Sequence, residues 1–190
     1  MVMSLHVLSA QSFARCFAAI YIDNGFPLDY LRYLFPRDKE TGHYIVSSTN
    51  IVGDLATHLA QPCIMPDTLS EEKGKTICIL DLPAVDGLPR NQWMQYSRAN
   101  MTHINHVLAD CFELDFYRYY LKGLHYGYEK KDIVETYVIS RNLVTGEPFD
   151  TLHKRVFRKE MDIMKQKVIQ LKRKAKYFFN ESDNNPLQPR

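Results

Sequence analysis

The sequence contains no run of about twenty apolar residues, the length that an α-helix needs to cross a bilayer. Its first residues also lack a basic stretch ahead of an apolar run, and Arg15 interrupts the apolar residues that are there. The pattern of a secretory signal peptide is therefore missing. Together these absences favour a soluble, cytoplasmic protein that does not enter a membrane.

Cysteine and glycine are both scarce. The four cysteines are far apart and form no Cys-x-x-Cys pair: Cys16, Cys63, Cys78 and Cys111. This spacing resembles neither a disulfide framework nor a zinc site, so we expect reduced thiols and no structural metal. Only eight glycines accompany twelve tyrosines and ten phenylalanines, a combination that favours packed helices over a glycine-punctuated β-barrel.

The charge of the chain is nearly balanced in total but unevenly distributed. Residues 151–176 contain ten basic side chains and two acidic ones, whereas the rest of the chain contains fourteen basic and twenty acidic ones. The net charge of +2 for the whole protein conceals this asymmetry. A segment with such an excess of positive charge attracts phosphates or an acidic surface.

The same basic segment has the apolar repeat of a long helix. Asp150 is a suitable N-cap, and apolar residues follow at alternating spacings of four and three: Phe157, Met161, Met164, Val168, Leu171, Ala175 and Phe178. A helix of roughly 28 residues, enough to contain this repeat, would extend about 42 Å. Because the positions that flank the repeat are mostly basic, like-charge repulsion disfavours a parallel homodimer. Packing on the protein's own domain, or on an acidic partner helix, is favoured instead.

The remaining patterns predict a mainly helical α+β protein with a small two-strand element and the long basic helix at its carboxyl end. Apolar periodicity and cap residues predict helices at 9–20, 27–35, 51–59, 91–123 and 132–141. Short apolar, β-branched runs predict strands at 43–47 and 76–80. We therefore divide the chain into an α+β part of unassigned role (1–95), a helical part (96–180) and a disordered tail (181–190).

Two runs within residues 127–159 resemble a known DNA-binding motif. Residues 127–134 read Gly-Tyr-Glu-Lys-Lys-Asp-Ile-Val, and residues 151–159 read Thr-Leu-His-Lys-Arg-Val-Phe-Arg-Lys. Together they are similar to the helix-turn-helix of region 4 in bacterial sigma factors and related regulators. The resemblance implies a first helix that crosses the DNA backbone and a second helix whose first turns enter the major groove.

These patterns favour a non-enzymatic nucleic-acid-binding protein, with DNA-binding regulation as one form of that function. The predicted contacts are six basic side chains of the final helix: Lys154, Arg155, Arg158, Lys159, Lys165 and Lys167. Lysine and arginine bind phosphates, and one or two of them can also read base edges. The alternative is a protein-interaction or assembly module whose long helix docks on an acidic partner.

Two weaker alternatives involve other residues. Aromatic and basic residues alternate from Phe116 to Tyr128, a mixture that can stack on single-stranded bases but more often forms a core. An enzyme with an unrecognised site is the third alternative, with Asp81, Asp86 and His103 as its candidate residues. The sequence shows no nucleophile paired with a base and indicates no cofactor, so we name no catalytic residue.

Overall fold

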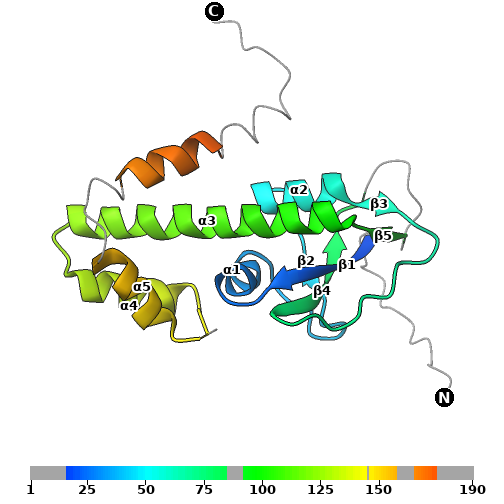
Figure 1. The fold of residues 1–190 in the computed structure, drawn as a ribbon, viewed down its shortest axis with the longest axis horizontal. Coiled ribbons are helices and arrows are strands. Elements are labelled where there is room, and N and C mark those ends of the chain that lie inside the picture. Colours follow the sequence, from blue (N-terminus) through cyan, green and yellow to red (C-terminus); the bar gives the residue numbers. More distant parts are fainter. Residues whose placement is uncertain (1–15, 85–91, 145, 158–164, 175–190) are drawn as a thin grey trace, which may run out of the picture.

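The protein's computed structural model describes residues 16–84, 92–144, 146–157 and 165–174 (Figure 1). The labelled elements are β1 (Cys16–Asp23), α1 (Phe26–Leu34), β2 (Tyr44–Ile45), α2 (Ile51–Leu59), β3 (Gln61–Pro62), β4 (Lys75–Leu82), β5 (Trp93–Gln95), α3 (Arg98–His125), α4 (Lys130–Ser140) and α5 (Pro148–Phe157). Residues 165–174 form a further helical segment. None of the described helices is both long enough and apolar enough to cross a membrane.

The strands form one mixed sheet in the order β2-β4-β1-β5-β3. β1 and β4 are its longest strands and pair antiparallel over their whole lengths, from Cys16 opposite Leu82 to Asp23 opposite Lys75. β2 runs parallel to β4, β5 runs parallel to β1, and β3 closes the far edge antiparallel to β5. Two eight-residue strands therefore carry the sheet, and three very short strands extend it.

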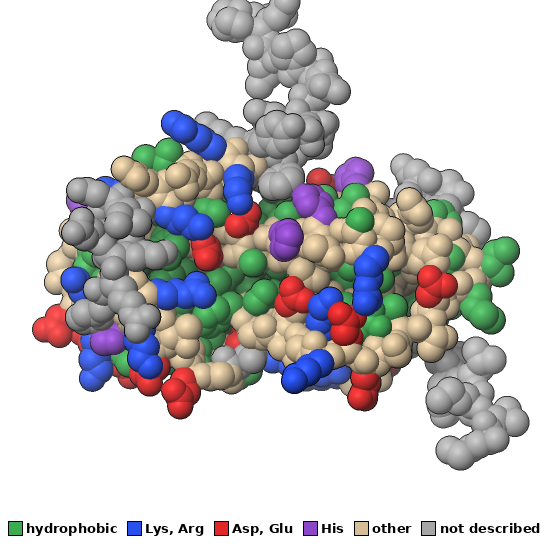
Figure 2. Space-filling model, viewed as in Figure 1, with side chains coloured by type: hydrophobic (Ala, Val, Ile, Leu, Met, Phe, Trp, Pro, Cys, Tyr) green, Lys and Arg blue, Asp and Glu red, His purple; other side chains and the backbone are tan. Residues whose placement is uncertain are grey.

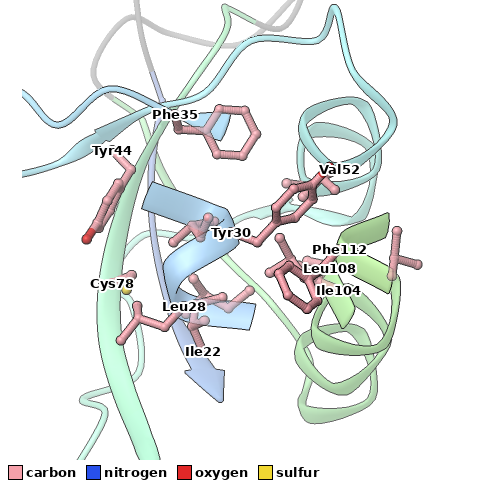
Figure 3. Close-up of a cluster of buried hydrophobic side chains, with 14 of the residues drawn as sticks. Ile22, Leu28, Tyr30, Phe35, Tyr44, Val52, Cys78, Ile104, Leu108 and Phe112 are labelled. Atoms are coloured by element: carbon pink, nitrogen blue, oxygen red, sulfur yellow. The ribbon is translucent and has the colours of Figure 1, made fainter. Parts of the chain in front are cut away.

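The helices α1, α2 and α3 cover one face of this sheet. The side chains that point towards them alternate along the two central strands and are buried: Cys16, Ala18, Ile20, Ile22, Cys78, Leu80 and Leu82. Figure 3 shows α1 between the strands and α3, with Leu28 and Tyr30 of α1 beside Ile104, Leu108 and Phe112 of α3. The opposite face of the sheet is more open, because Ile77 and Trp93 on it are exposed.

Helix α3, with 28 residues, packs against β1, α1, α2 and α4. The buried side chain of Asn105 ties it to the sheet. Asn105 Oδ1 accepts a hydrogen bond from the Asp23 amide at 2.8 Å, and its Nδ2 donates to the Tyr21 carbonyl at 2.8 Å. One cluster of buried apolar residues runs from β1 to residues 165–174, so the core is continuous across residue 95.

Two acidic side chains connect α4 and the residues after it to earlier parts of the chain. Asp29 of α1 is 1% exposed, and its Oδ2 accepts a hydrogen bond from the Val144 amide at 3.1 Å. Asp115 of α3 accepts from Arg141 Nε at 2.8 Å and from the Tyr137 hydroxyl at 3.1 Å. Burial, together with the nearby Asp115 carboxylate, raises the pKa of Tyr137, so its hydroxyl keeps the proton that it donates.

The α+β class and several predicted elements are confirmed. α1 has Pro27 in its first turn, as proline's fixed φ favours. α2 begins after Asn50, whose side chain accepts a hydrogen bond from the Gly53 amide at 2.9 Å. β2, β4 and α4 overlap the segments at 43–47, 76–80 and 132–141 that local patterns predict.

The sheet has five strands, so the prediction of a small two-strand element is wrong. β1 occupies residues 16–23, part of which was predicted as the end of a helix at 9–20. A continuous apolar run fits either a buried strand or a buried helix, and pairing with β4 is what favours the strand here. β3 and β5 are two and three residues long, too short to give a sequence pattern.

The prediction of one long carboxy-terminal helix also needs correction, because α5 and residues 165–174 are not collinear. Arg155 and Lys167 both lie within 4 Å of the Glu113 carboxylate. In one straight helix these two residues would be about 18 Å apart along the axis, whereas here both reach the same carboxylate. Figure 1 accordingly shows α5 and the segment 165–174 on different sides of α3. The predicted tail at 181–190 lies outside the described residues.

Replacing Gly53 tests the contact between α2 and the loop before it. A Cβ atom at this position would overlap the carbonyl oxygen of Ser47. We expect Gly53→Ala to lower the free energy of unfolding by about 2 kcal/mol or more. Asn50→Ala, which only removes the cap of the same helix, should cost about 1 kcal/mol. Urea unfolding followed by circular dichroism measures both, and equal midpoints for Gly53→Ala and the wild type would contradict the packing described.

Candidate nucleic-acid interface

The basic segment contributes seven described cations, from α5 and from residues 165–174: Lys154, Arg155, Lys165, Lys167, Lys172, Arg173 and Lys174. The predicted contact residues Arg158 and Lys159 lie outside the described residues. The helix of residues 165–174 packs on the protein itself, because Val168 and Leu171 of its apolar repeat are only 7% and 3% exposed. The predicted packing on the protein's own domain is thus observed for this part of the repeat.

Helix α3 presents two carboxylates to the basic segment. The Glu113 carboxylate lies 3.0 Å from Lys167 Nζ and 3.7 Å from Arg155 Nη1. One turn earlier, Asp110 Oδ2 lies 2.8 Å from Lys174 Nζ. The adjacent Glu113 carboxylate raises the pKa of Lys167, so this ammonium group stays charged at neutral pH.

Arg155 and Lys167, two of the six predicted nucleic-acid contacts, therefore face the protein's own side chains. The Arg155 guanidinium also lies over the ring of Phe26, 5.3 Å from its centroid. Through Arg155 and Lys167, Glu113 connects α5 and the segment 165–174 to α3. These two cations therefore help to hold α5 and the segment 165–174 against α3.

A second group of cations points to solvent. Lys154, Lys172 and Arg173 are exposed, and none has an ion-pair partner among the described residues. Lys165 is exposed as well and, seven residues before Lys172, lies on the same flank of the helix. Figure 2 shows Lys and Arg side chains over the segment 165–174, with acidic side chains between it and α3. We call Lys154, Lys165, Lys172 and Arg173 the exposed basic set.

In the helix pair whose sequence resembles a helix-turn-helix, acidic residues lie at the N-terminus of the second helix. α4 and α5 pack against each other and are joined by residues 141–147, whereas a helix-turn-helix uses a turn of three to four residues. Glu147 immediately precedes α5, and Asp150 lies in its first turn, both exposed. Carboxylates at these positions repel phosphates where a recognition helix would approach DNA.

Comparison with known proteins finds no matching family model, no similar curated protein and no similar solved structure.

The aromatic residues from Phe116 to Tyr128 divide into buried and exposed groups. Phe116, Tyr117 and Tyr120 are buried in the core, whereas Tyr126 and Tyr128 are 65% and 64% exposed. Gly127, at φ 80°, ends α3 in a Schellman turn, in which the Tyr128 amide donates to the Gly123 carbonyl at 3.2 Å. This turn places both exposed rings at the end of α3, next to the start of α4.

Sequence reasoning missed a histidine–carboxylate pair on the sheet. His43 Nδ1 lies 2.7 Å from Asp81 Oδ1, and the ring of Phe17 packs against that of His43. The two residues meet because β2 pairs with β4, a long-range contact that leaves no local signal. Asp86, the other candidate carboxylate, lies outside the described residues. In the described ranges no three His, Cys, Asp or Glu side chains are grouped to hold a metal.

Removing the charge of Glu113 should loosen the segment 165–174. In Glu113→Gln two cations lose their carboxylate, and partly exposed ion pairs of this kind contribute up to about 1 kcal/mol. We expect amide hydrogen exchange over residues 166–174 to become a few times faster at low salt, and less so at high salt. Glu135→Gln is the matched control, because Glu135 is exposed on α4 and has no described ion pair. Equal exchange rates in the two variants would show that Glu113 does not hold this helix.

Proposed function

We propose that this protein is a non-enzymatic nucleic-acid-binding protein that contacts phosphates through the exposed basic set. In this proposal Lys154, Lys165, Lys172 and Arg173 supply the contacts. Arg155 and Lys167 do not contact the ligand; their ion pairs with Glu113 hold α5 and the segment 165–174 on α3. Phosphate contacts of this kind fix a protein on the nucleic-acid backbone without selecting a base sequence.

The observation that carries the proposal is the polar outer side of the helix at 165–174. Its apolar residues Val168 and Leu171 are buried. What remains outside is mostly amide and cationic: Lys165, Gln166, Gln170, Lys172 and Arg173, with Ile169 as the exposed apolar residue of this segment. Protein–protein interfaces are depleted in lysine at their centres, whereas lysine, arginine and glutamine are common contacts to phosphate and sugar.

Electrostatics favour the same kind of partner. Glu113 and Asp110 of α3 are in ion pairs with Arg155, Lys167 and Lys174. Lys154, Lys172 and Arg173 are exposed and have no ion pair among the described residues, so they create a positive surface potential, which attracts a polyanion and makes its binding depend strongly on salt. Because Glu147 and Asp150 stand at the start of α5, we expect phosphate binding rather than base reading by that helix.

An acidic protein is the competing partner, since the same cations would attract it. A binding experiment with polyglutamate distinguishes the two partners, because this acidic polypeptide presents carboxylates without phosphates or bases. If the wild type binds polyglutamate but neither a single-stranded nor a duplex oligonucleotide, the interaction-module alternative is favoured over the proposal.

The double variant Lys172→Gln, Arg173→Gln tests the surface directly. Losing two phosphate contacts should weaken oligonucleotide binding by about tenfold or more near 0.1 M salt and reduce the steepness of its salt dependence. Fluorescence anisotropy titrations at several salt concentrations measure both quantities. The charge-matched control is Lys39→Gln, Lys73→Gln, which removes two exposed lysines from the loops that precede β2 and β4. The same loss of affinity in test and control would refute a localised binding surface.

A further inference from the structure

A pocket of about 480 Å³ lies where the end of α3 meets α4. Side chains of both helices and of the turn between them line it: Tyr119, Lys122, Tyr126, Tyr128, Asp132 and Thr136. Its volume falls within the range of about 300–1,000 Å³ that is usual for small-molecule sites. Its lining includes no described residue of the basic segment and neither Glu113 nor its ion-pair partners, so among the described residues it is a separate feature.

The walls of the pocket are held by packing on three sides. Gly123 of α3 touches Ile133 of α4 so closely that a Cβ at Gly123 would lie 2.7 Å from an Ile133 side-chain atom. The Schellman turn at Gly127 determines where Tyr126 and Tyr128 leave the backbone. The ring of Tyr119 rests against that of Tyr137, with centroids 5.3 Å apart. A site built in this way is preformed and loses little entropy when a ligand binds.

The polar side chains of the pocket are available to a ligand. The side chains of Lys122, Tyr128, Asp132 and Thr136 form no hydrogen bond, ion pair or ring contact with another residue in the described ranges. The pocket thus combines aromatic rings, a cation and a carboxylate in one small space.

From this combination we infer that the pocket binds one nucleotide unit. An exposed tyrosine ring stacks on the base, Lys122 pairs with the phosphate, and Asp132 accepts a hydrogen bond from an amino or imino group of the base. A quaternary ammonium ligand would meet the like charge of Lys122. A simple aromatic carboxylate would pair with Lys122 but offers no hydrogen-bond donor to Asp132. A nucleotide offers both an anionic group and hydrogen-bond donors.

The nucleotide has two possible sources, a free mononucleotide or an unpaired position in a strand. For a strand the inference rests on the proposed function and adds to it a preference for single strands. Bases in a duplex are already stacked and paired, so they cannot enter the pocket without being extruded. The exposed basic set would then bind the backbone while the pocket holds one base.

The test measures binding of AMP, adenosine, an oligo(dA) strand and the corresponding duplex by isothermal titration calorimetry. Tyr128→Ala should weaken binding of AMP, of the strand, or of both by about tenfold, because base–aromatic stacking has this magnitude. Tyr128→Phe is the matched control, since it keeps the ring. Lys122→Gln should weaken AMP but not adenosine, which has no phosphate. Tyr128 is exposed, so circular dichroism should show every Tyr128 variant to be folded.

The source of the nucleotide follows from which probe responds to Tyr128→Ala: AMP alone indicates a free nucleotide, and the strand alone indicates a strand. Binding of both probes that is unchanged by Tyr128→Ala and Lys122→Gln, or no binding of either, would overturn the inference. If Lys172→Gln, Arg173→Gln weakens binding of the strand, and Tyr128→Ala weakens binding of neither the strand nor AMP, the proposed function stands and the pocket assignment fails. If instead Tyr128→Ala weakens binding of the strand and Lys172→Gln, Arg173→Gln does not, the pocket assignment stands and the basic surface is refuted.

Discussion

The fold depends on one constraint: helix α3 must meet different neighbours on several sides along its length. α1, α2 and α4 pack directly against it, and α5 and the segment 165–174 reach it through Glu113. Polar side chains on α3 determine where these neighbours dock. Asn105 bonds to the end of β1, and Asp115 bonds to Arg141 at the end of α4. A buried or half-buried polar group is costly unless its partner is in place, so each of these bonds selects one arrangement of the helices.

The positive charge of the carboxy-terminal segment has two roles, which depend on where each cation lies relative to α3. Cations over α3 find Asp110 and Glu113 and contribute to docking. Those on the outer side, such as Lys172 and Arg173, face water. Because half-exposed ion pairs are weak individually, the burial of Val168 and Leu171 provides much of the attachment, and the charges fix its register. The polar face that is left outward is a consequence of that attachment.

The two proposed ligand contacts differ in physical origin, and they complement each other. Attraction between the exposed basic set and phosphates is long-range, weakly selective and sensitive to salt. Stacking of a base in the pocket at the end of α3 would be short-range and would select unpaired bases, with little dependence on salt. Proteins that bind single strands commonly combine these two terms. In this proposal the attraction for phosphates arises largely from the helix of residues 165–174, and the stacking arises from the turn in which α3 ends.

Local sequence determined the elements whose signals lie within a few residues: the cap of α2 at Asn50, Pro27 in the first turn of α1, the apolar run of β4 and the excess of charge after residue 150. Tertiary structure alone decided that residues 16–23 form a strand, because this required pairing with β4 some sixty positions away. It also separated Lys167 from Lys172. Both are lysines of one helix, and only the position of Glu113 makes the first an internal tie and leaves the second exposed. Propensity and capping act between neighbours in the chain, whereas burial and ion pairing depend on which distant elements meet.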